Sequence, residues 1–218
     1  ALGYKSVESF EWISTATVFP FVLSVRSDSP RQTVAQLIAA AGVKPDAVSY
    51  GSAGVGSTQH LTGALLASQS GTMMLHVPYK GDAGSLAALL AGDVDFVVAP
   101  GTATLPHVKG GRLKAIAVTG AARWQGLPDV PTVQEGGVAG FDVGSWAGLA
   151  TTAGTPRAIV ERLNAEVQKA LQVPEVRARL ESFGGEVRGS TPEEMRNRVA
   201  TEVQRWSKVI ADAHIQKQ

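Results

Sequence analysis

Residues 50–61 contain three glycines, with serines at 52 and 57, where a β-like run at 47–50 ends and a helix-like run at 61–67 begins. A glycine-rich turn that opens a helix presents several backbone N–H groups that have no partner within the helix. The helix dipole adds partial positive charge at the same point. The segment therefore predicts an anion site between a strand and a helix, with a plain tight turn as the alternative.

The spacing of the glycines argues against a nucleotide as the anion. Gly51 and Gly56 have the P-loop spacing, but Ser57 stands where the phosphate-binding lysine belongs. Gly54 and Gly56 likewise lack the third glycine of the dinucleotide fingerprint. A small carboxylate suits a turn that offers N–H and hydroxyl donors without a fixed lysine.

Two more turns follow the same strand, turn and helix order. Residues 78–82 separate a strand at 73–77 from a helix at 83–91, for which Asp82 is the expected N-cap. Residues 99–102 separate a strand at 94–98 from a short helix. Ligands of open α/β sheets bind where such turns converge. We expect the Tyr79 side chain to face the ligand, whereas Lys80 is either a site residue or a solvated surface lysine.

The rest of the chain continues this alternation and then becomes helical. Residues 10–25 read as two extended stretches broken near Pro20, and 114–118 as a further strand. Strands alternating with helices predict a mostly parallel sheet. The last third reads as three helices, and Thr191 with Glu194 forms a capping box at the start of the third.

Composition excludes several functional classes. The net charge is +1 and aromatic residues make up 6% of the chain, so nucleic-acid binding is unsupported. No apolar run approaches the roughly 20 residues of a membrane-spanning helix. There are no cysteines, and no ligand spacing indicates a metal or a cofactor. A Ser57/His60 nucleophile–base pair would suit a hydrolase, but the chain lacks the G-x-S-x-G motif, so no catalytic residue is expected.

Six motifs in order carry a resemblance that covers essentially the whole chain. They are residues 50–61 (YGSAGVGSTQHL), 76–81 (HVPYKG), 105–119 (LPHVKGGRLKAIAVT), 127–132 (LPDVPT), 153–156 (AGTP) and 189–194 (GSTPEE). With them, the chain resembles the Bug-type solute receptors of tripartite tricarboxylate transporters.

The resemblance implies a periplasmic protein with a type II periplasmic-binding-protein-like α/β fold, in which two domains are joined by two crossing strands. The crossing strands would lie near 21–25 and 114–118, giving one ligand-binding domain at 25–118 and a discontinuous one at 1–24 and 119–218. A small organic carboxylate would bind in the interdomain cleft and pass to a two-subunit membrane permease. The candidate ligand-binding residues are those of the three turns: Ser52, Ala53, Gly54, Gly56, Ser57, Thr58, Tyr79, Lys80, Gly81, Ala99, Pro100, Gly101 and Thr102.

Two departures from the family pattern shape the remaining expectations. The family has a strand, a glycine-rich loop and a helix before the region where this chain begins. The discontinuous domain is therefore expected to lack its N-terminal part and the chain to self-associate, and a truncated interaction module without transport activity is an alternative. The turn at 99–102 also carries no acidic residue, which favours a carboxylate without an amino group.

Overall fold

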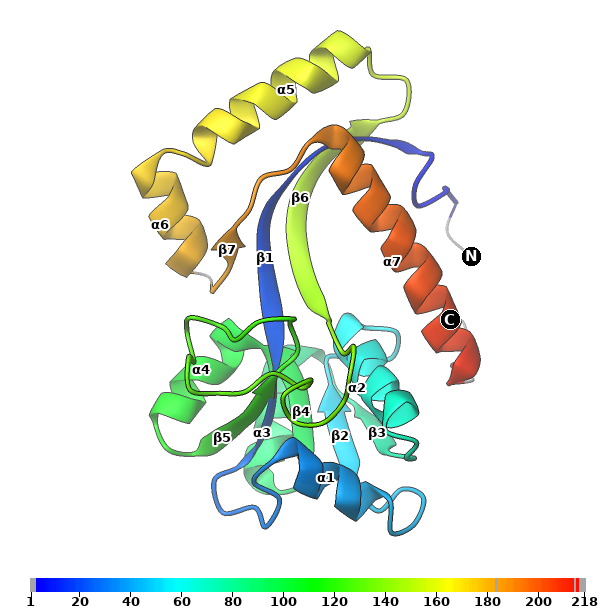
Figure 1. Cartoon of the computed structure of the whole chain (residues 1–218), viewed down its shortest axis with the longest axis vertical. Helices are drawn as coiled ribbons and strands as arrows, with labels where there is room; N and C mark the ends of the chain where they lie inside the picture. Colours follow the sequence, from blue (N-terminus) through cyan, green and yellow to red (C-terminus); the bar gives the residue numbers. More distant parts are fainter. Residues whose placement is uncertain (1–2, 183, 214, 216–218) are drawn as a thin grey trace. The chain divides into compact units, whose positions relative to one another are not determined.

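The computed structural model describes residues 3–182, 184–213 and 215, which form two compact units (Figure 1). Unit 1 contains the described residues up to Phe19 and those of Trp146–Lys208. Unit 2 contains Pro20–Ser145 and the described residues of Val209–Lys217. The elements are β1 (Phe10–Arg26), α1 (Val34–Ala41), β2 (Ser49–Ser52), α2 (Thr58–Gln69), β3 (Leu75–Pro78), α3 (Gly81–Ala91), β4 (Phe96–Pro100), α4 (Gly101–Lys109), β5 (Leu113–Val118), β6 (Gly144–Thr152), α5 (Arg157–Ala170), α6 (Pro174–Ser182), β7 (Glu186–Val187) and α7 (Pro192–Asp212).

Unit 2 is built on a mixed sheet with the strand order β3-β2-β4-β1-β5. Strands β3, β2 and β4 are parallel, as the alternation of strands and helices predicts. Strand β1 runs antiparallel to both β4 and β5. The parallel part of the sheet therefore aligns the carboxyl ends of β2, β3 and β4 at one edge.

Helices cover both faces of this sheet. Leu86 and Leu89 of α3 pack with Val97 of β4 on one face, where partly buried residues of α4 join the cluster. On the other face, Tyr50 of β2 stacks on Phe96 of β4 and its hydroxyl donates to the carbonyl of His60 in α2. Because successive strand side chains point to opposite faces, β2 and β4 have buried residues on both.

The division between the units differs from the predicted boundaries. Residues 119–143 pack with the sheet of unit 2, because Val118 N–H donates to Pro131 O at 2.9 Å and Thr119 Oγ1 donates to Val143 O at 2.6 Å. The segment 114–118, expected to cross between domains, is β5 and lies wholly within this sheet. The strands that contain the boundaries, at 19/20 and 145/146, are β1 and β6.

Unit 1 combines the N-terminal part of β1 with β6, β7 and the three C-terminal helices. Strand β1 pairs with β7 at Thr17 and Val18. The predicted capping box at the start of α7 is present, since Thr191 N–H donates to Glu194 Oε2 at 2.8 Å and Glu194 N–H to Thr191 Oγ1 at 3.1 Å. Asn164 of α5 donates to the carbonyl of Ile13 at 2.7 Å and so fixes α5 beside β1.

Two local expectations are wrong. Residues 10–26 form one continuous strand, because Pro20 lies between the β7 ladder, which ends at Val18, and the β4 ladder, which begins at Phe21, where its missing N–H costs little. Asp82 is not the N-cap of α3. Lys80 occupies that position without a side-chain hydrogen bond, and Asp82 lies in the first turn. Among the described residues, no helix combines the length and apolar character needed to cross a membrane.

Candidate functional site

All thirteen predicted site residues lie at the edge of the unit 2 sheet where β2, β3 and β4 end. Strand β2 ends at Ser52, β3 at Pro78 and β4 at Pro100. The next helix begins within six residues of each strand end, at Thr58, Gly81 and Gly101 respectively. Three helix N-termini are thus gathered at one edge of a parallel sheet, the usual position of ligands in open α/β folds. We call this set of loops and helix starts the strand-end site.

The glycine-rich turn after β2 needs glycine at two positions. Gly54 has φ of 136° and Gly56 has φ of 76°, values that L side chains adopt at a cost. Ser57 is the N-cap of α2, where its Oγ accepts from His60 N–H at 3.2 Å and donates to Gly54 O at 2.7 Å. Ser52 is fully buried, and its Oγ accepts from Gly54 N–H at 3.1 Å. Both serine hydroxyls therefore shape the turn from inside.

The turn after β3 is bonded directly to the glycine-rich turn. Tyr79 N–H donates to Ser52 O at 3.1 Å, and Gly81 N–H donates to Ala53 O at 3.2 Å. The Tyr79 ring packs beside the α3 cluster, 3.4 Å from where a Cβ on Gly51 would lie, so it is part of the core wall. Lys80 is exposed, as expected for a surface lysine.

The turn after β4 is covered by an aromatic side chain that the sequence analysis did not identify. Ala99 is buried, Pro100 is the N-cap of α4 and Thr102 is exposed. A Cβ on Gly101 would lie 2.7 Å from the Trp124 ring, so this glycine allows the indole to pack against the start of α4. Trp124 comes from the loop-rich segment 119–143, where no periodicity marked it as a neighbour of the turn.

The three helix starts leave several N–H groups available to a ligand. No acceptor within the described residues is found for the N–H groups of Thr58 and Gln59 in α2, Asp82 and Ala83 in α3, or Thr102 and Ala103 in α4. These are first-turn groups, which carry the positive end of each helix dipole. In contrast, the N–H groups of Gly54 and Gly56 bond to Ser52 Oγ and His60 Nδ1.

The histidines near the turn do not form a catalytic pair. His60 Nδ1 accepts from Gly56 N–H at 3.1 Å, and Ser57 Oγ contacts the backbone N–H of His60, so serine and imidazole do not meet as nucleophile and base. Burial lowers the pKa of His60, and burial together with His60 lowers that of His76 to about 4. Both rings are thus neutral at pH 7. No group of metal-binding side chains is found among the described residues.

One carboxylate at the strand-end site was not singled out as a site residue. Asp82 Oδ1 accepts from Gln59 Nε2 at 2.9 Å, which joins the first turns of α2 and α3. Burial raises the pKa of Asp82, while the Gln59 hydrogen bond acts in the opposite direction. Its position in the sequence, four residues after Pro78, gave no sign that it would meet Gln59.

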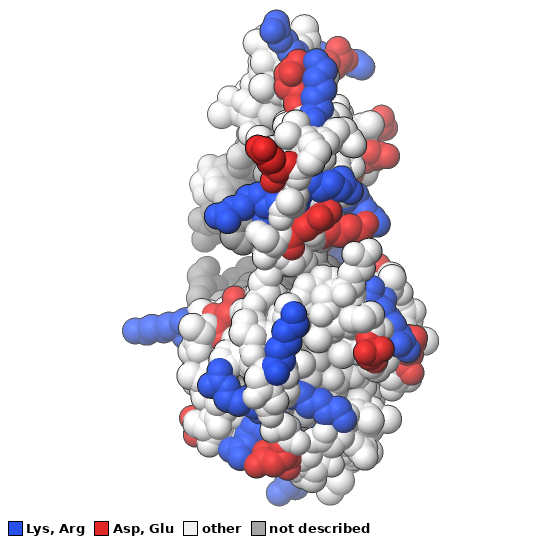
Figure 2. Space-filling model, turned by 90° about the vertical axis from the view of Figure 1, so that its left-hand side faces the viewer, with Lys and Arg blue, Asp and Glu red and all other residues white. Residues whose placement is uncertain are grey.

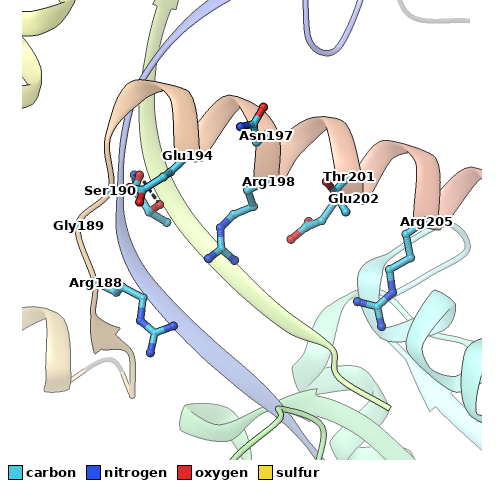
Figure 3. A pocket seen from close by; sticks show the side chains of 10 residues that line it. Arg188, Gly189, Ser190, Glu194, Asn197, Arg198, Thr201, Glu202 and Arg205 are labelled. Atoms are coloured by element: carbon cyan, nitrogen blue, oxygen red, sulfur yellow. Dashed lines mark hydrogen bonds between the residues drawn. The ribbon is translucent and has the colours of Figure 1, made fainter. Parts of the chain in front are cut away.

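Unit 1 contains a separate cavity of about 530 Å³ along α7 (Figure 3). Arg188, Arg198, Glu202 and Arg205 point into it. The cavity has charges of both signs, and Glu202 accepts from the Trp146 indole at 2.9 Å. Lysines and arginines are likewise interspersed with acidic residues on the surface shown in Figure 2. This cavity therefore lacks the uniform donor set of the strand-end site.

A second cavity in unit 2, of about 250 Å³, lies beside the loop after β1. Its charged residues pair with one another: Arg26 with Asp28, and Arg31 with Asp95, each at 2.6 Å. This pairing leaves little charge to attract a ligand.

Comparison with known proteins places the chain in a family. The sequence profile of the tripartite tricarboxylate transporter family receptors, TctC, matches residues 1–215. The chain belongs to this receptor family. The family consists of solute receptors, and the Ser57 and His60 side chains do not meet as nucleophile and base.

Several relatives are similar over nearly the whole chain. A UPF0065 protein from the tcbD–tcbE intergenic region of Pseudomonas sp. strain P51 is 38% identical over 210 residues, which is 96% of this chain and 62% of the relative. The Rhodopseudomonas palustris protein Rpa4515 with adipate is 34% identical with a TM-score of 0.85, covering 99% of this chain and 72% of that one. MatC from the same organism, with bound malate, is 31% identical with a TM-score of 0.80, covering 96% and 72%. The chain thus spans less than two thirds of the Pseudomonas relative.

Proposed function

We propose that this chain acts in a periplasmic solute receptor that binds a small organic carboxylate at the strand-end site and delivers it to a two-subunit membrane permease. The proposal rests on one observation above others. Three helix N-termini with unbonded N–H groups lie at one edge of the parallel strands, in a chain of the transporter receptor family. Similarity to proteins solved with adipate and with malate supports a carboxylate as the anion.

The donors in this proposal are backbone N–H groups, chiefly those of Thr58 and Gln59. The predicted site residues fall into two groups. Ser52, Gly54, Gly56 and Ser57 fix the turn and Tyr79 packs against the core, whereas Ala53, Thr58, Lys80, Gly81 and the 99–102 turn border the ligand. A charge-assisted hydrogen bond contributes roughly 1.5–3 kcal/mol, so a few such N–H groups would account for micromolar binding.

The ligand is proposed to lack an amino group. The turn at 99–102 carries no acidic residue, and the nearby Asp82 already accepts from Gln59. Burying an ammonium group without a counter-charge would weaken the binding free energy by about 2–5 kcal/mol.

Calorimetry with a matched pair of ligands tests the proposal. Malate and aspartate share one carbon skeleton and differ in a hydroxyl against an ammonium group. We expect malate or adipate to bind and aspartate to bind at least about tenfold more weakly. Tight aspartate binding would refute the ligand class, and failure of all three acids together with succinate and citrate would refute the carboxylate site.

Delivery and location need separate tests. Cell fractionation should recover the native protein in the periplasm. Uptake of the bound acid by cells should depend on both the receptor gene and the two permease genes. Uptake that is unaffected by deletion of the receptor gene would contradict the delivery step.

A further inference from the structure

Two stacked imidazoles lie directly beneath the glycine-rich turn. The rings of His60, from α2, and His76, from β3, are 3.6 Å apart with an angle of 10° between their planes. His60 is only 6% exposed. The Tyr50 ring lies beside both, with centroids 6.4 Å and 5.0 Å away. The stack thus occupies a fixed place on the α2 face of the sheet.

Each imidazole reaches one of the two positive-φ glycines. His60 Nδ1 accepts from Gly56 N–H at 3.1 Å. His76 Nε2 lies 2.6 Å from Ser52 Oγ, which in turn accepts from Gly54 N–H at 3.1 Å. Both glycine N–H groups are therefore turned inward, toward the stack.

With the N–H groups of Gly54 and Gly56 bonded inward, only the neighbouring N–H groups of the loop can bind a ligand. Successive backbone N–H groups of such a turn line a concave anion-binding site where they are not bonded within the protein. The N–H groups of Ala53 and Val55 flank Gly54, and neither has an acceptor in the described part of the chain. With the N–H groups of Thr58 and Gln59, they remain available to a ligand.

We propose that the His60–His76 stack is a positioning device that holds the glycine-rich turn in its anion-binding form by accepting, directly and through Ser52, the inward N–H groups of Gly56 and Gly54. This inference deepens the proposed carboxylate site and relies on it for the effect on affinity. The effect on the shape of the turn does not depend on any ligand.

The device works only with a neutral His60 ring. A protonated Nδ1 would face Gly56 N–H as a second donor and remove the hydrogen bond. The groups around His60 offer it no counter-charge. They are the neutral His76 ring of β3, the buried Tyr50 phenol of β2 and the Ser57 hydroxyl, while the Asp82 carboxylate of α3 accepts from Gln59 instead.

The test compares two substitutions of His60 of similar shape, of which only one supplies a hydrogen-bond acceptor. In His60→Asn, Oδ1 lies near the former Nδ1 position and can still accept from Gly56 N–H, whereas His60→Leu cannot. Amide NMR spectra of the full chain without ligand report on Gly56, and calorimetry with adipate and malate reports on binding. Matched control variants, His107→Asn and His107→Leu, change a histidine of α4 that contacts Arg112 instead of the turn.

We expect the Gly56 amide resonance to stay near its wild-type position in His60→Asn and to move in His60→Leu. The wild-type resonance should also titrate in acid, and this titration should be absent in His60→Asn. The affinity for the acid that binds should fall at least about tenfold in His60→Leu and less than about threefold in His60→Asn. Far-UV circular dichroism checks that each variant is folded.

A Gly56 resonance that is the same in both His60 variants and does not titrate would overturn the inference, whatever the affinities are. If His60→Leu does not fold, His76→Gln and His76→Leu serve in its place, read at the Gly54 amide. If no acid binds the wild type, the carboxylate proposal fails while the resonance still decides the role of the stack.

Discussion

At the scale of single residues, the side chains that fix the conformation of the turn after β2 differ from the backbone groups that are free to bind a ligand. The polar side chains of Ser52, Ser57 and His60 form their hydrogen bonds within or directly beneath the turn. The groups left over belong to the backbone. Ligand affinity should therefore be sensitive to backbone conformation more than to the identity of any one polar side chain.

Gly56→Val is expected to weaken carboxylate binding. A Cβ at Gly56 would meet nothing within 4 Å, so the variant acts only through the φ of 76°, at a cost of about 1–3 kcal/mol. Gly71→Val is the matched control, because Gly71 has φ of 65°, is equally open and lies past the other end of α2. Both should lose similar stability in urea, but only Gly56→Val should lose affinity in calorimetry. Equal affinity in the two variants would remove the turn from the site.

His76 should make the stability of the fold depend on pH in mild acid. Its folded-state pKa of about 4 lies below the ordinary value of 6.5, so the unfolded chain takes up a proton first as the pH falls. The free energy of unfolding should decrease by about 1 kcal/mol between pH 7 and pH 5, a figure reduced for the partial exposure of the ring. Urea unfolding of His76→Gln should show a smaller decrease over this range than wild type. Parallel curves for the two proteins would argue against the lowered pKa.

The predicted site residues do lie together at one edge of the sheet, but the sequence did not indicate the contacts between their elements. The glycines between β2 and α2 predicted the turn, in which Gly54 and Gly56 have positive φ, and anion binding there stays a prediction. The His60–His76 contact and the Gln59–Asp82 contact join residues about 16 to 23 positions apart, and only the packing of α2 on the sheet brings them together. Trp124 could not be found because its segment has no periodicity and its one motif, residues 127–132, does not include it.

At the scale of elements, the helices after each parallel strand start close to where glycine and polar turns predicted them. The Thr191 cap of α7 bonds as its sequence pattern indicates, and Thr33 caps α1 by accepting from Gln36 N–H. Strand β7 has only two residues and leaves no pattern to detect. The sequence predicted a break in β1 at Pro20. Residue propensity does not show that one strand pairs with β7 before this proline and with β4 after it.

Thr191→Ala should destabilise unit 1 through the start of α7. Thr191 Oγ1 accepts from Glu194 N–H, and loss of an N-cap costs about 1 kcal/mol. Thr191→Ser keeps the acceptor and should remain close to wild type in thermal unfolding. Carboxylate affinity should be unchanged in both, since α7 starts in unit 1 and the strand-end site is in unit 2. If alanine and serine lower the melting temperature equally, the cap contributes little.

At the scale of the whole molecule, unit 1 has several exposed large apolar side chains on its helices. On α5, Ile159 is 50% exposed and Leu163 is 40% exposed, and the two lie four residues apart on one helix face. The fold class was predicted from the alternation of elements and the motifs. The predicted domain boundaries differ from those of the two units, because residues 119–143 join unit 2 through individual hydrogen bonds. No sequence pattern indicates such hydrogen bonds.

The exposed face of α5 should cause this 218-residue chain to self-associate. Sedimentation velocity at increasing concentration should show a growing fraction of larger species. Ile159→Glu combined with Leu163→Glu should restore the monomer, whereas Arg162→Glu, which also lowers the net charge by two on an exposed position of α5, should not. A wild-type chain that stays monomeric at ~100 µM, well above micromolar dissociation constants, would contradict this expectation.

The two units also differ in how their residues are distributed along the chain. The sheet of unit 2 comes from one continuous stretch, Pro20–Ser145, whereas unit 1 joins residues up to Phe19 to Trp146–Lys208. Closing contacts between distant parts of a chain is slow, and domains made of continuous stretches form first. During synthesis, the loops of the strand-end site would therefore fold before the first half of β1 can pair with β6 and β7.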